Sequence, residues 1–423
     1  MKKILIKNIK ELIQVVDDNR LKTSGESMAE LKTIQEAYLL INGDKIAKYG
    51  SMAEYNAETH TDDYDQIIDA SNRMVFPAFV DSHTHLVYAA SREIEYIDKI
   101  KGLSYEEIAK RGGGILNSAK RIAEISEEQL FHQSLQRLKD IIAMGTGAVE
   151  IKSGYGLSLK SEIKMLKVIQ RLKEESPLTI KSTFLGAHAV PLEYRGRQED
   201  YVKLVVEEMI PAVGEAKLAD YVDVFCDKGF FTVYQTARIL SAAKAYGMIP
   251  KIHANELDYS GGIEVGVANN ALSVDHLEYT GEKEIRNLLA SNTMPTLLPG
   301  AAFFLGMVYA PARKMISAGL PIALASDFNP GSSPSGNMQL IAAMGSILFK
   351  MLPEEVIHAT TINTAYAMGV SNRLGSISKG KIANIIITKP MPTYHYWTYS
   401  YGDNKVETMI LNGEIIDERS LKR

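Results

Sequence analysis

The sequence predicts an α/β protein: a TIM-like (β/α)8 barrel with a small flanking β-sandwich that both ends of the chain form. Three observations support this fold. Short apolar runs alternate with segments of helical period through the middle of the chain, as in βα units around a parallel sheet. Eight such runs can be counted, which is the number of strands in a closed barrel of this kind. No G-x-G-x-x-G turn follows an early strand, and this disfavours a dinucleotide-binding fold.

The barrel strands are expected at the eight apolar runs, in chain order: 75–81, 146–151, 178–185, 221–226, 249–253, 271–276, 293–298 and 321–327. Several stretches between or after them place apolar residues at helical spacing. Helices are therefore predicted over residues 161–173, 200–209, 233–246 and 335–352.

The two ends of the chain follow a different pattern. Short alternating runs occur at Ile4-Leu5-Ile6 and over residues 37–41, where the turn Asn42-Gly43-Asp44 follows. Residues 381–387 and 408–414 repeat this pattern near the other end. We therefore expect a discontinuous β-sandwich domain over residues 1–74 and 375–423, and a barrel domain over residues 75–374.

Composition limits the kinds of partner. Lys and Arg number 47 against 51 for Asp and Glu, and neither sign forms a long run that would suit nucleic acid or a membrane surface. No stretch approaches the roughly 18 apolar residues of a membrane helix. Cys226 is the only cysteine, so intramolecular disulfides are excluded. These features favour a cytoplasmic protein with a small-molecule substrate.

Polar residues at the ends of the predicted strands indicate a metal site, because active sites of such barrels lie at the carboxyl ends of the strands. The first strand leads into His83-Thr84-His85, whose spacing puts both imidazoles on one face of an extended chain. The fifth run ends at His253 and the eighth at Asp327. Three nitrogens and one oxygen suit one divalent ion, zinc or iron, that activates water. A lone H-x-H is more often structural, so the prediction depends on all four residues.

The set of strand-end residues resembles the amidohydrolase superfamily, whose pattern also includes a histidine at the end of strand six, here His276. The resemblance spans the whole chain, and the terminal β segments are similar to the flanking sandwich of that superfamily. Many members bridge two metals through a modified lysine at the end of strand four. Here that strand ends at Cys226-Asp227, with Lys228 just beyond. A mononuclear site is therefore expected, and the simpler interpretation of Lys228 is a solvated surface lysine.

A narrower resemblance is to a hydrolase family of histidine degradation, which opens a five-membered cyclic amide with a propionate tail to give a formimino-glutamate. The segments that carry it are His83-Thr84-His85-Leu86 with Ser91-Arg92-Glu93, Lys152-Ser153-Gly154-Tyr155-Gly156, Phe184-Leu185-Gly186-Ala187-His188, His253-Ala254-Asn255-Glu256 and Ser326-Asp327-Phe328-Asn329-Pro330-Gly331-Ser332.

This resemblance implies a role for each residue of the site. Asp327 is expected to act as general base and then general acid for a metal-activated water. His276 is expected to stabilise the oxyanion, and His188 and Glu256 are expected to assist catalysis. The family resemblance also implies a homodimer. The implied substrate-binding residues are Arg92, Tyr155, His188, Glu256, Asn329, Gly331 and Ser332.

Simpler interpretations of several of these residues are open at this stage. Arg92 is compatible with a solvated loop arginine, and Tyr155 with a partly buried aromatic. Asn329 precedes Pro-Gly and would form a turn in any case. The metal pattern also fits a deaminase or another cyclic-amide hydrolase of the superfamily. A barrel used only for assembly is a more remote alternative, because its metal ligands would not need to be intact.

Overall fold

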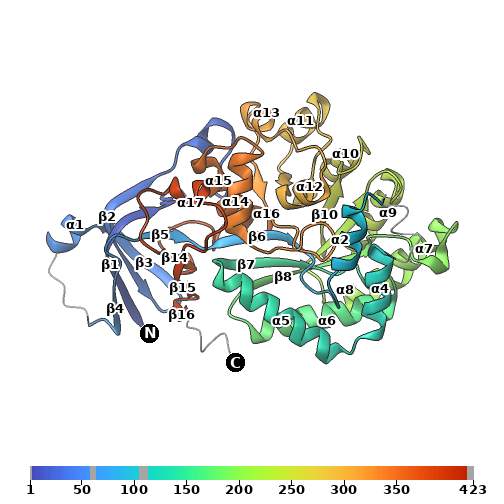
Figure 1. The fold of residues 1–423 in the computed structure, drawn as a ribbon, viewed down its shortest axis with the longest axis horizontal. Helices are drawn as coiled ribbons and strands as arrows, with labels where there is room; N and C mark the ends of the chain where they lie inside the picture. Colours follow the sequence, from blue (N-terminus) through green and yellow to red (C-terminus); the bar gives the residue numbers. More distant parts are fainter. Residues whose placement is uncertain (1, 58–62, 104–112, 417–423) are drawn as a thin grey trace.

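In the computed structural model, which describes residues 2–57, 63–103 and 113–416, the chain forms two eight-stranded sheets that lie next to each other (Figure 1). One sheet is parallel, and its spatial order follows the chain without a crossover. This is the predicted (β/α)8 barrel. Its strands are β6 (Phe79–Thr84), β7 (Thr146–Lys152), β8 (Thr179–Ala187), β9 (Tyr221–Cys226), β10 (Ile249–Ala254), β11 (Ser273–His276), β12 (Met294–Leu297) and β13 (Ala323–Leu324).

The first and last strands meet through the residues that follow β13. The backbone N–H of Asp327 donates to the carbonyl oxygen of His83 at 3.0 Å, and that of His85 donates to Phe328 at 2.9 Å. A parallel bridge joins Thr84 to Phe328. The last strand is thus much shorter than the predicted run 321–327, and an irregular segment closes the barrel beside the expected metal ligands.

The predicted strand 75–81 is two strands in two different sheets. β5 (Met74–Pro77) pairs with the terminal sheet, and the barrel strand β6 begins at Phe79. Pro77 has no N–H and fixes its own φ, so the ladder changes at this position. Ala78 donates to Asn384 of the terminal sheet, whereas Phe79 donates to Gly145 of the barrel.

Helices surround the barrel between and after its strands, and three of them cover the predicted ranges 161–173, 233–246 and 335–352 in whole or in part. The predicted helix 200–209 runs through a π-helical turn, η3 (Val205–Met209). The barrel helices and helical turns are α2 (Glu93–Ile100), α4 (Ile115–Glu124), α5 (Glu127–Ala143), α6 (Leu159–Glu175), η2 (Leu192–Tyr194), α7 (Gln198–Leu204), α8 (Ile210–Glu215), α9 (Val233–Lys244), α10 (Gly262–Ala268), α11 (Glu282–Leu289), α12 (Pro299–Leu305), α13 (Ala312–Ser317), α14 (Met338–Ile347), α15 (Pro353–Thr360) and α16 (Ile362–Ala367).

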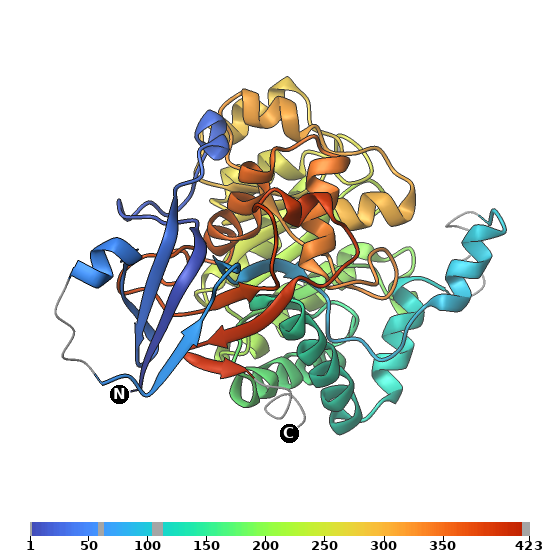
Figure 2. The same ribbon diagram turned by 60° about the vertical axis from the view of Figure 1, so that its left-hand side comes forward.

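The second sheet is built from both ends of the chain, as predicted. Its longest strand, β1, pairs antiparallel with β2 and parallel with β4 and β5 at its two ends. Figure 2 shows the blue, N-terminal strands of this sheet to the left of the barrel helices. Its elements are β1 (Lys3–Ile13), η1 (Gly25–Ala29), β2 (Thr33–Asn42), β3 (Lys45–Ser51), α1 (Met52–Ala57), β4 (Gln66–Asp69), β5, β14 (Ile385–Thr388), α17 (Tyr396–Tyr399), β15 (Val406–Leu411) and β16 (Glu414–Ile416).

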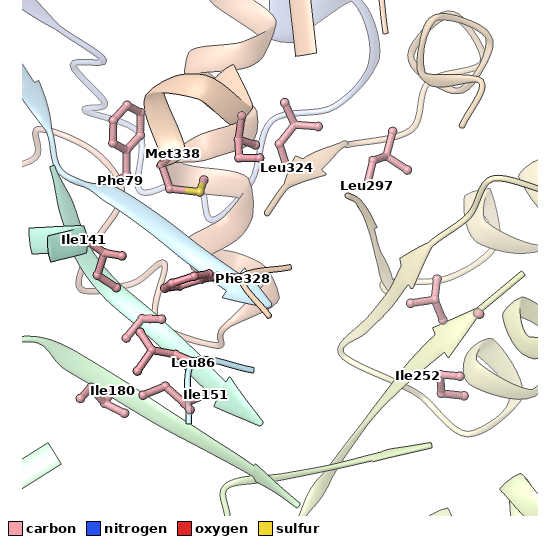
Figure 3. Close-up of a cluster of buried hydrophobic side chains, with 14 of the residues drawn as sticks. Phe79, Leu86, Ile141, Ile151, Ile180, Ile252, Leu297, Leu324, Phe328 and Met338 are labelled. Carbon is pink, nitrogen blue, oxygen red and sulfur yellow. The ribbon is translucent and has the colours of Figure 1, made fainter. Parts of the chain in front are cut away.

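Two apolar cores support these sheets. The larger core fills the space between barrel strands and helices, and Figure 3 shows part of it, including Ile151 of β7, Ile141 of α5 and Met338 of α14. The smaller core lies in the terminal sheet and is rich in isoleucine, including Ile4, Ile6 and Ile9. Within the ranges described, no helix combines the length and apolar character needed to cross a bilayer.

Candidate active site

Four side chains converge at the carboxyl end of the barrel. His83 and His85 come from the end of β6, His253 from β10, and Asp327 from the segment after β13. The Nε2 atoms of His85 and His253 lie 3.3 Å apart. Asp327 Oδ1 lies 3.5 Å from His83 Nε2 and 3.7 Å from His85 Nε2. The four expected ligands are therefore neighbours.

The separations of these nitrogen and oxygen atoms match those of ligands around one metal ion. Ligands held about 2.0–2.1 Å from a tetrahedral ion stand about 3.3 Å apart, close to the separations found here. His83 Nε2 is buried and has no hydrogen-bond partner among the described residues. Burial lowers the pKa values of His83 and His85 well below the ordinary value, so both imidazoles are neutral and can offer a lone pair. The three histidines and the carboxylate therefore suit one divalent cation.

Two buried carboxylates orient the histidines from behind. The Nδ1–H group of His83 donates to Asp275 Oδ2 at 2.7 Å, and that of His253 donates to Asp223 Oδ2 at 3.0 Å. An imidazole that donates from Nδ1 presents the lone pair of Nε2 toward the site. Both carboxylates are fully buried.

The backbone at the strand ends has unusual dihedral angles. Asp327 has φ 53°, Asn255 has φ 55°, His276 has φ 86° and Leu277 has φ 70°. Such left-handed conformations cost non-glycine residues on the order of 1 kcal/mol or more, and they persist where the surrounding structure enforces them. They turn the chain sharply where β10, β11 and β13 end.

A cavity of about 890 Å³ opens above the ligands. Every residue predicted for the site lines this cavity except His83, which is completely buried below it. The cavity wall also includes apolar side chains such as Phe225, Phe230 and Phe304. The residues that sequence analysis selected and that line it are His85, Arg92, Tyr155, His188, His253, Glu256, His276, Asp327, Asn329, Gly331 and Ser332.

Arg92 lies at the rim, at the start of α2. Its Nε and Nη2 atoms donate to Ser118 Oγ at 3.0 and 2.8 Å, and no described carboxylate forms an ion pair with it. A Cβ atom at Gly331 would clash with Arg92 Nη1, so glycine leaves room for the guanidinium. The guanidinium also lies over the Tyr155 ring, 5.5 Å from its centroid. Arg92 therefore offers a positive charge to the cavity.

The loop after β7 carries Tyr155 and is anchored by one buried carboxylate that sequence analysis missed. Glu162 of α6 accepts hydrogen bonds from the backbone N–H groups of Gly154, Gly156 and Leu157 at 3.1, 2.7 and 2.9 Å. The carbonyl oxygen of Gly154 accepts from Nδ1 of His188 at 3.0 Å. One loop thus holds both Tyr155 and the His188 ring in place. Burial lowers the pKa of His188 to about 3, so this ring is neutral.

His276 stands between two carboxyl groups. Its Nε2 lies 3.6 Å from Glu256 Oε2 and its Nδ1 lies 3.9 Å from Glu278 Oε2. Burial and the nearby Asp327 raise the pKa of Glu256 to about 8. Burial raises the pKa of Glu278 well above its ordinary value as well. Glu278 is a second residue that sequence analysis missed.

The segment after Asp327 is a tight turn, in agreement with the simpler interpretation of Asn329. The Oδ1 atom of Asn329 accepts from the N–H groups of Gly331 and Ser332, both at 2.8 Å. The Ser332 hydroxyl donates to Asp327 Oδ2 at 3.1 Å. Burial raises the pKa of Asp327 to about 7, and this hydrogen bond opposes the shift. The turn therefore orients the Asp327 carboxyl group.

Lys228 lies outside the site. Its side chain is 75% exposed and pairs with Asp258 at 2.8 Å. The solvated interpretation of this lysine is therefore confirmed, and a bridging lysine at the end of strand four is absent from the described cluster. Instead, Asp227 accepts hydrogen bonds from the backbone N–H groups of Glu256 and Leu257.

Three of the buried acidic residues that sequence analysis missed share a signal in the sequence. Asp223, Asp275 and Glu150 interrupt apolar strands with a charge at positions that bury completely. An ionisable residue inside a barrel strand is rare without a partner, so each could have been identified as part of a polar network. Glu162 gave no such signal, because a glutamate in the first turn of a helix is common on solvated surfaces.

Comparisons with known proteins agree with this geometry. A family model described as the amidohydrolase family matches residues 74–416. Imidazolonepropionase from Flavobacterium psychrophilum is 54% identical over 414 residues, which cover 98% of this chain and 100% of that protein. Imidazolonepropionase from Christiangramia forsetii is 52% identical over 413 residues, with the same coverage. The imidazolonepropionase of Alkaliphilus oremlandii is 43% identical and covers 98% of both chains.

Solved structures support the fold alone. A triazine hydrolase variant superposes with a TM-score of 0.75 at 14% identity, covering 99% of this chain and 96% of that one. Guanine deaminase from E. coli gives a TM-score of 0.74 at 14% identity, covering 99% of this chain and 100% of that one. From the family match and the full-length similarity of its relatives, this chain belongs to the amidohydrolase family and, within it, to the imidazolonepropionases.

Proposed function

We propose that this protein hydrolyses the cyclic amide of 4-imidazolone-5-propanoate to N-formimidoyl-L-glutamate in histidine degradation. The observation that carries the proposal is one cavity whose wall contains Arg92 together with His85, His253 and Asp327, with His83 buried below it. The histidines and Asp327 suit the activation of water by a metal ion, and Arg92 suits a substrate that carries a carboxylate. Relatives named imidazolonepropionase, more than 50% identical over nearly the whole chain, support the same reaction.

The proposed metal centre is mononuclear, with Zn²⁺ or Fe²⁺/Fe³⁺ held by these four residues. When bound, such an ion supplies a Lewis acid that polarises the ring carbonyl and makes a water nucleophilic at neutral pH. Imidazole and carboxylate ligands suit both metals, so elemental analysis of the purified protein distinguishes them.

The chain's own groups then bind the substrate and move protons. The Arg92 guanidinium grips the propionate carboxylate through two parallel hydrogen bonds, as planar guanidinium groups do. Tyr155 and His188 define the wall against which the ring lies. In this proposal the turn of Asn329, Gly331 and Ser332 binds the glutamate end of the product.

Asp327 acts first as a base and then as an acid. Its carboxylate takes a proton from the attacking water and later gives that proton to the leaving ring nitrogen. Its hydrogen bond from Ser332 leaves Oδ1 directed toward the histidine cluster. Nε2 of His276 lies 3.6 Å from Glu256 Oε2 and lines the cavity, so an N–H group at this nitrogen can donate to the developing oxyanion, an effect commonly worth about 3 kcal/mol. Glu256 also holds a proton for the ring nitrogen.

The family resemblance further supports a homodimer. The buried free thiol of Cys226 fits a reducing cytoplasm. Light scattering on the purified protein measures the oligomeric state directly. A mass of one chain at micromolar concentration would contradict the homodimer.

The test is an assay with freshly generated imidazolone propionate, whose ring absorbance disappears when it opens. Metal-replete protein should consume it rapidly, and chelator-treated protein should not, with activity restored when zinc or ferrous iron is added. A metal-loaded protein that leaves the substrate intact would refute the proposal and point to another amidohydrolase substrate, such as that of a deaminase.

A further inference from the structure

Two lysines lie buried directly beneath the histidine cluster, and the proposed chemistry does not use them. Lys152 is the last residue of β7, and Lys251 lies in β10 two residues before His253. Both side chains are completely buried. Taking an ammonium group out of water costs several kcal/mol unless partners surround it, so these positions need an explanation.

The lysines are enclosed by three buried carboxylates. Lys152 Nζ donates to Glu150 Oε1 at 2.7 Å and to Asp223 Oδ2 at 2.8 Å. Lys251 Nζ donates to the other oxygen of Glu150. Asp275 Oδ2 lies 3.8 Å from one ammonium and 3.9 Å from the other. Two positive and three negative groups thus form one fully buried cluster.

This cluster contacts the metal ligands through two of its carboxylates. The Asp223 oxygen bound to Lys152 is the one that accepts from Nδ1 of His253. The Asp275 oxygen between the two lysines accepts from Nδ1 of His83. Lys251 also donates to the carbonyl oxygen of Ser82, the residue before His83, at 2.9 Å.

Stability alone does not account for the arrangement. Buried ion pairs contribute little net stability, and apolar residues of similar volume often replace them without loss. Orientation does account for it. Each carboxylate has another partner at its first oxygen. Asp223 Oδ1 accepts from the backbone N–H of His253 at 3.0 Å. Asp275 Oδ1 accepts from the Ser273 hydroxyl at 2.6 Å. The lysines lie at the second oxygen of each carboxylate, which is the oxygen that accepts from the imidazole.

We propose that Lys152 and Lys251 are positioning residues of the metal centre. They hold Asp223 and Asp275 so that the Nε2 lone pairs of His253 and His83 converge on the ion. Lys152 has the larger effect, because it shares an oxygen of Asp223 with His253. The inference rests on the metal site proposed above.

The test is zinc affinity, measured by competition between the metal-free full-length protein and a chromophoric chelator. Lys152→Met should bind zinc about 10- to 100-fold more weakly than the wild type, the range found when groups behind metal ligands are removed. Lys381→Met is the matched control. The buried Lys381 ammonium donates to the carbonyl oxygen of Ser371 at 2.6 Å, and both residues are distant in sequence from the metal ligands. The Lys381→Met variant should therefore bind zinc as tightly as the wild type does.

A Lys152→Met variant with wild-type zinc affinity would overturn the inference, and so would an equal loss of affinity in Lys381→Met. A wild type that binds no zinc or ferrous ion would instead overturn the metal site itself. If Lys152→Met does not fold, Lys152→Gln removes the positive charge and shortens the side chain by one atom, so Asp223 loses its ammonium partner. For that variant, ¹⁵N NMR of labelled histidines should show that His253 no longer carries its proton only on Nδ1. An unchanged His253 spectrum with unchanged affinity would reject the proposal.

Discussion

Two regions of the molecule bury histidines, and they satisfy them differently. At the seam between the terminal sheet and the barrel, His358 of α15 uses both ring nitrogens: Gln14 Nε2 donates to Nδ1 at 2.9 Å, and Nε2 donates to the carbonyl oxygen of Glu30 at 3.1 Å. At the barrel mouth, His83 Nε2 and His85 Nδ1 are buried without a partner among the described residues. Burial alone therefore does not distinguish structural from functional histidines. The presence or absence of hydrogen-bond partners for the ring nitrogens distinguishes the two kinds of histidine.

The largest effect should come from the carboxylate of the mouth. Asp327→Asn removes the proton acceptor while it preserves the shape of the side chain. We expect kcat to fall by about 10³-fold or more, with the thermal unfolding temperature nearly unchanged. Steady-state kinetics on metal-loaded protein measure this loss. A variant that retains the wild-type kcat would remove Asp327 from the proton transfers.

The next effect concerns the rim of the same cavity. Arg92→Ala should raise KM by roughly 100-fold, because a hydrogen bond to a charged group is worth about 1.5–3 kcal/mol. The change in kcat should be smaller, since Arg92 lies away from the reacting bond. Arg92→Lys keeps the charge and loses the two-pronged geometry, so an intermediate KM is expected. If Arg92→Ala leaves KM unchanged, the substrate carboxylate binds elsewhere.

The seam histidine should affect stability and not catalysis. Burial lowers the pKa of His358 to about 4, below the ordinary 6.5, so the unfolded chain binds a proton first as the pH falls. The free energy of unfolding should therefore decrease between pH 6.5 and pH 4, by about 2 kcal/mol between pH 7 and pH 5. His358→Gln should lose this part of the pH dependence. Urea titrations of both proteins at the two pH values give the comparison, and equal slopes would contradict the assignment.

The smallest effect should come from the anchor of the Tyr155 loop. Glu162→Gln keeps the size of the side chain but replaces one acceptor oxygen with a donor that faces backbone N–H groups. We expect KM to rise about five- to tenfold, corresponding to the weakening of roughly one hydrogen bond, with zinc content unchanged. An unaltered KM would mean that the loop keeps its position without Glu162.

The sequence predicted the barrel well because its strands are buried on both faces and appear as short, largely apolar runs. The predicted strand boundaries were wrong where an apolar run does not reveal which strand it pairs with. Residues 75–81 read as one strand, but Pro77 ends the pairing with the terminal sheet and β6 starts anew at Phe79. The run 321–327 read as a full strand, but only Ala323–Leu324 is one, because the chain must turn at Asp327 to close the barrel.

The site was predictable in part, because active-site residues of such barrels lie at the carboxyl ends of the strands. Residues in short segments at strand ends, such as His83-Thr84-His85, were identified from their position. The partners behind them were not, because Asp223 and Asp275 meet the histidines only after four different strands close into a barrel. Contacts between residues this far apart in the chain depend on tertiary structure, which local patterns do not encode.

The most direct test of the account is the identity of the reaction product. Mass spectrometry and an ammonia assay should be run on imidazolone propionate after incubation with the metal-loaded protein. Hydrolysis of the ring amide predicts an open-chain product that equals the substrate plus one water, with every nitrogen retained and no ammonia released. Release of ammonia, or a product that keeps the ring intact, would contradict the account and identify this barrel as a deaminase.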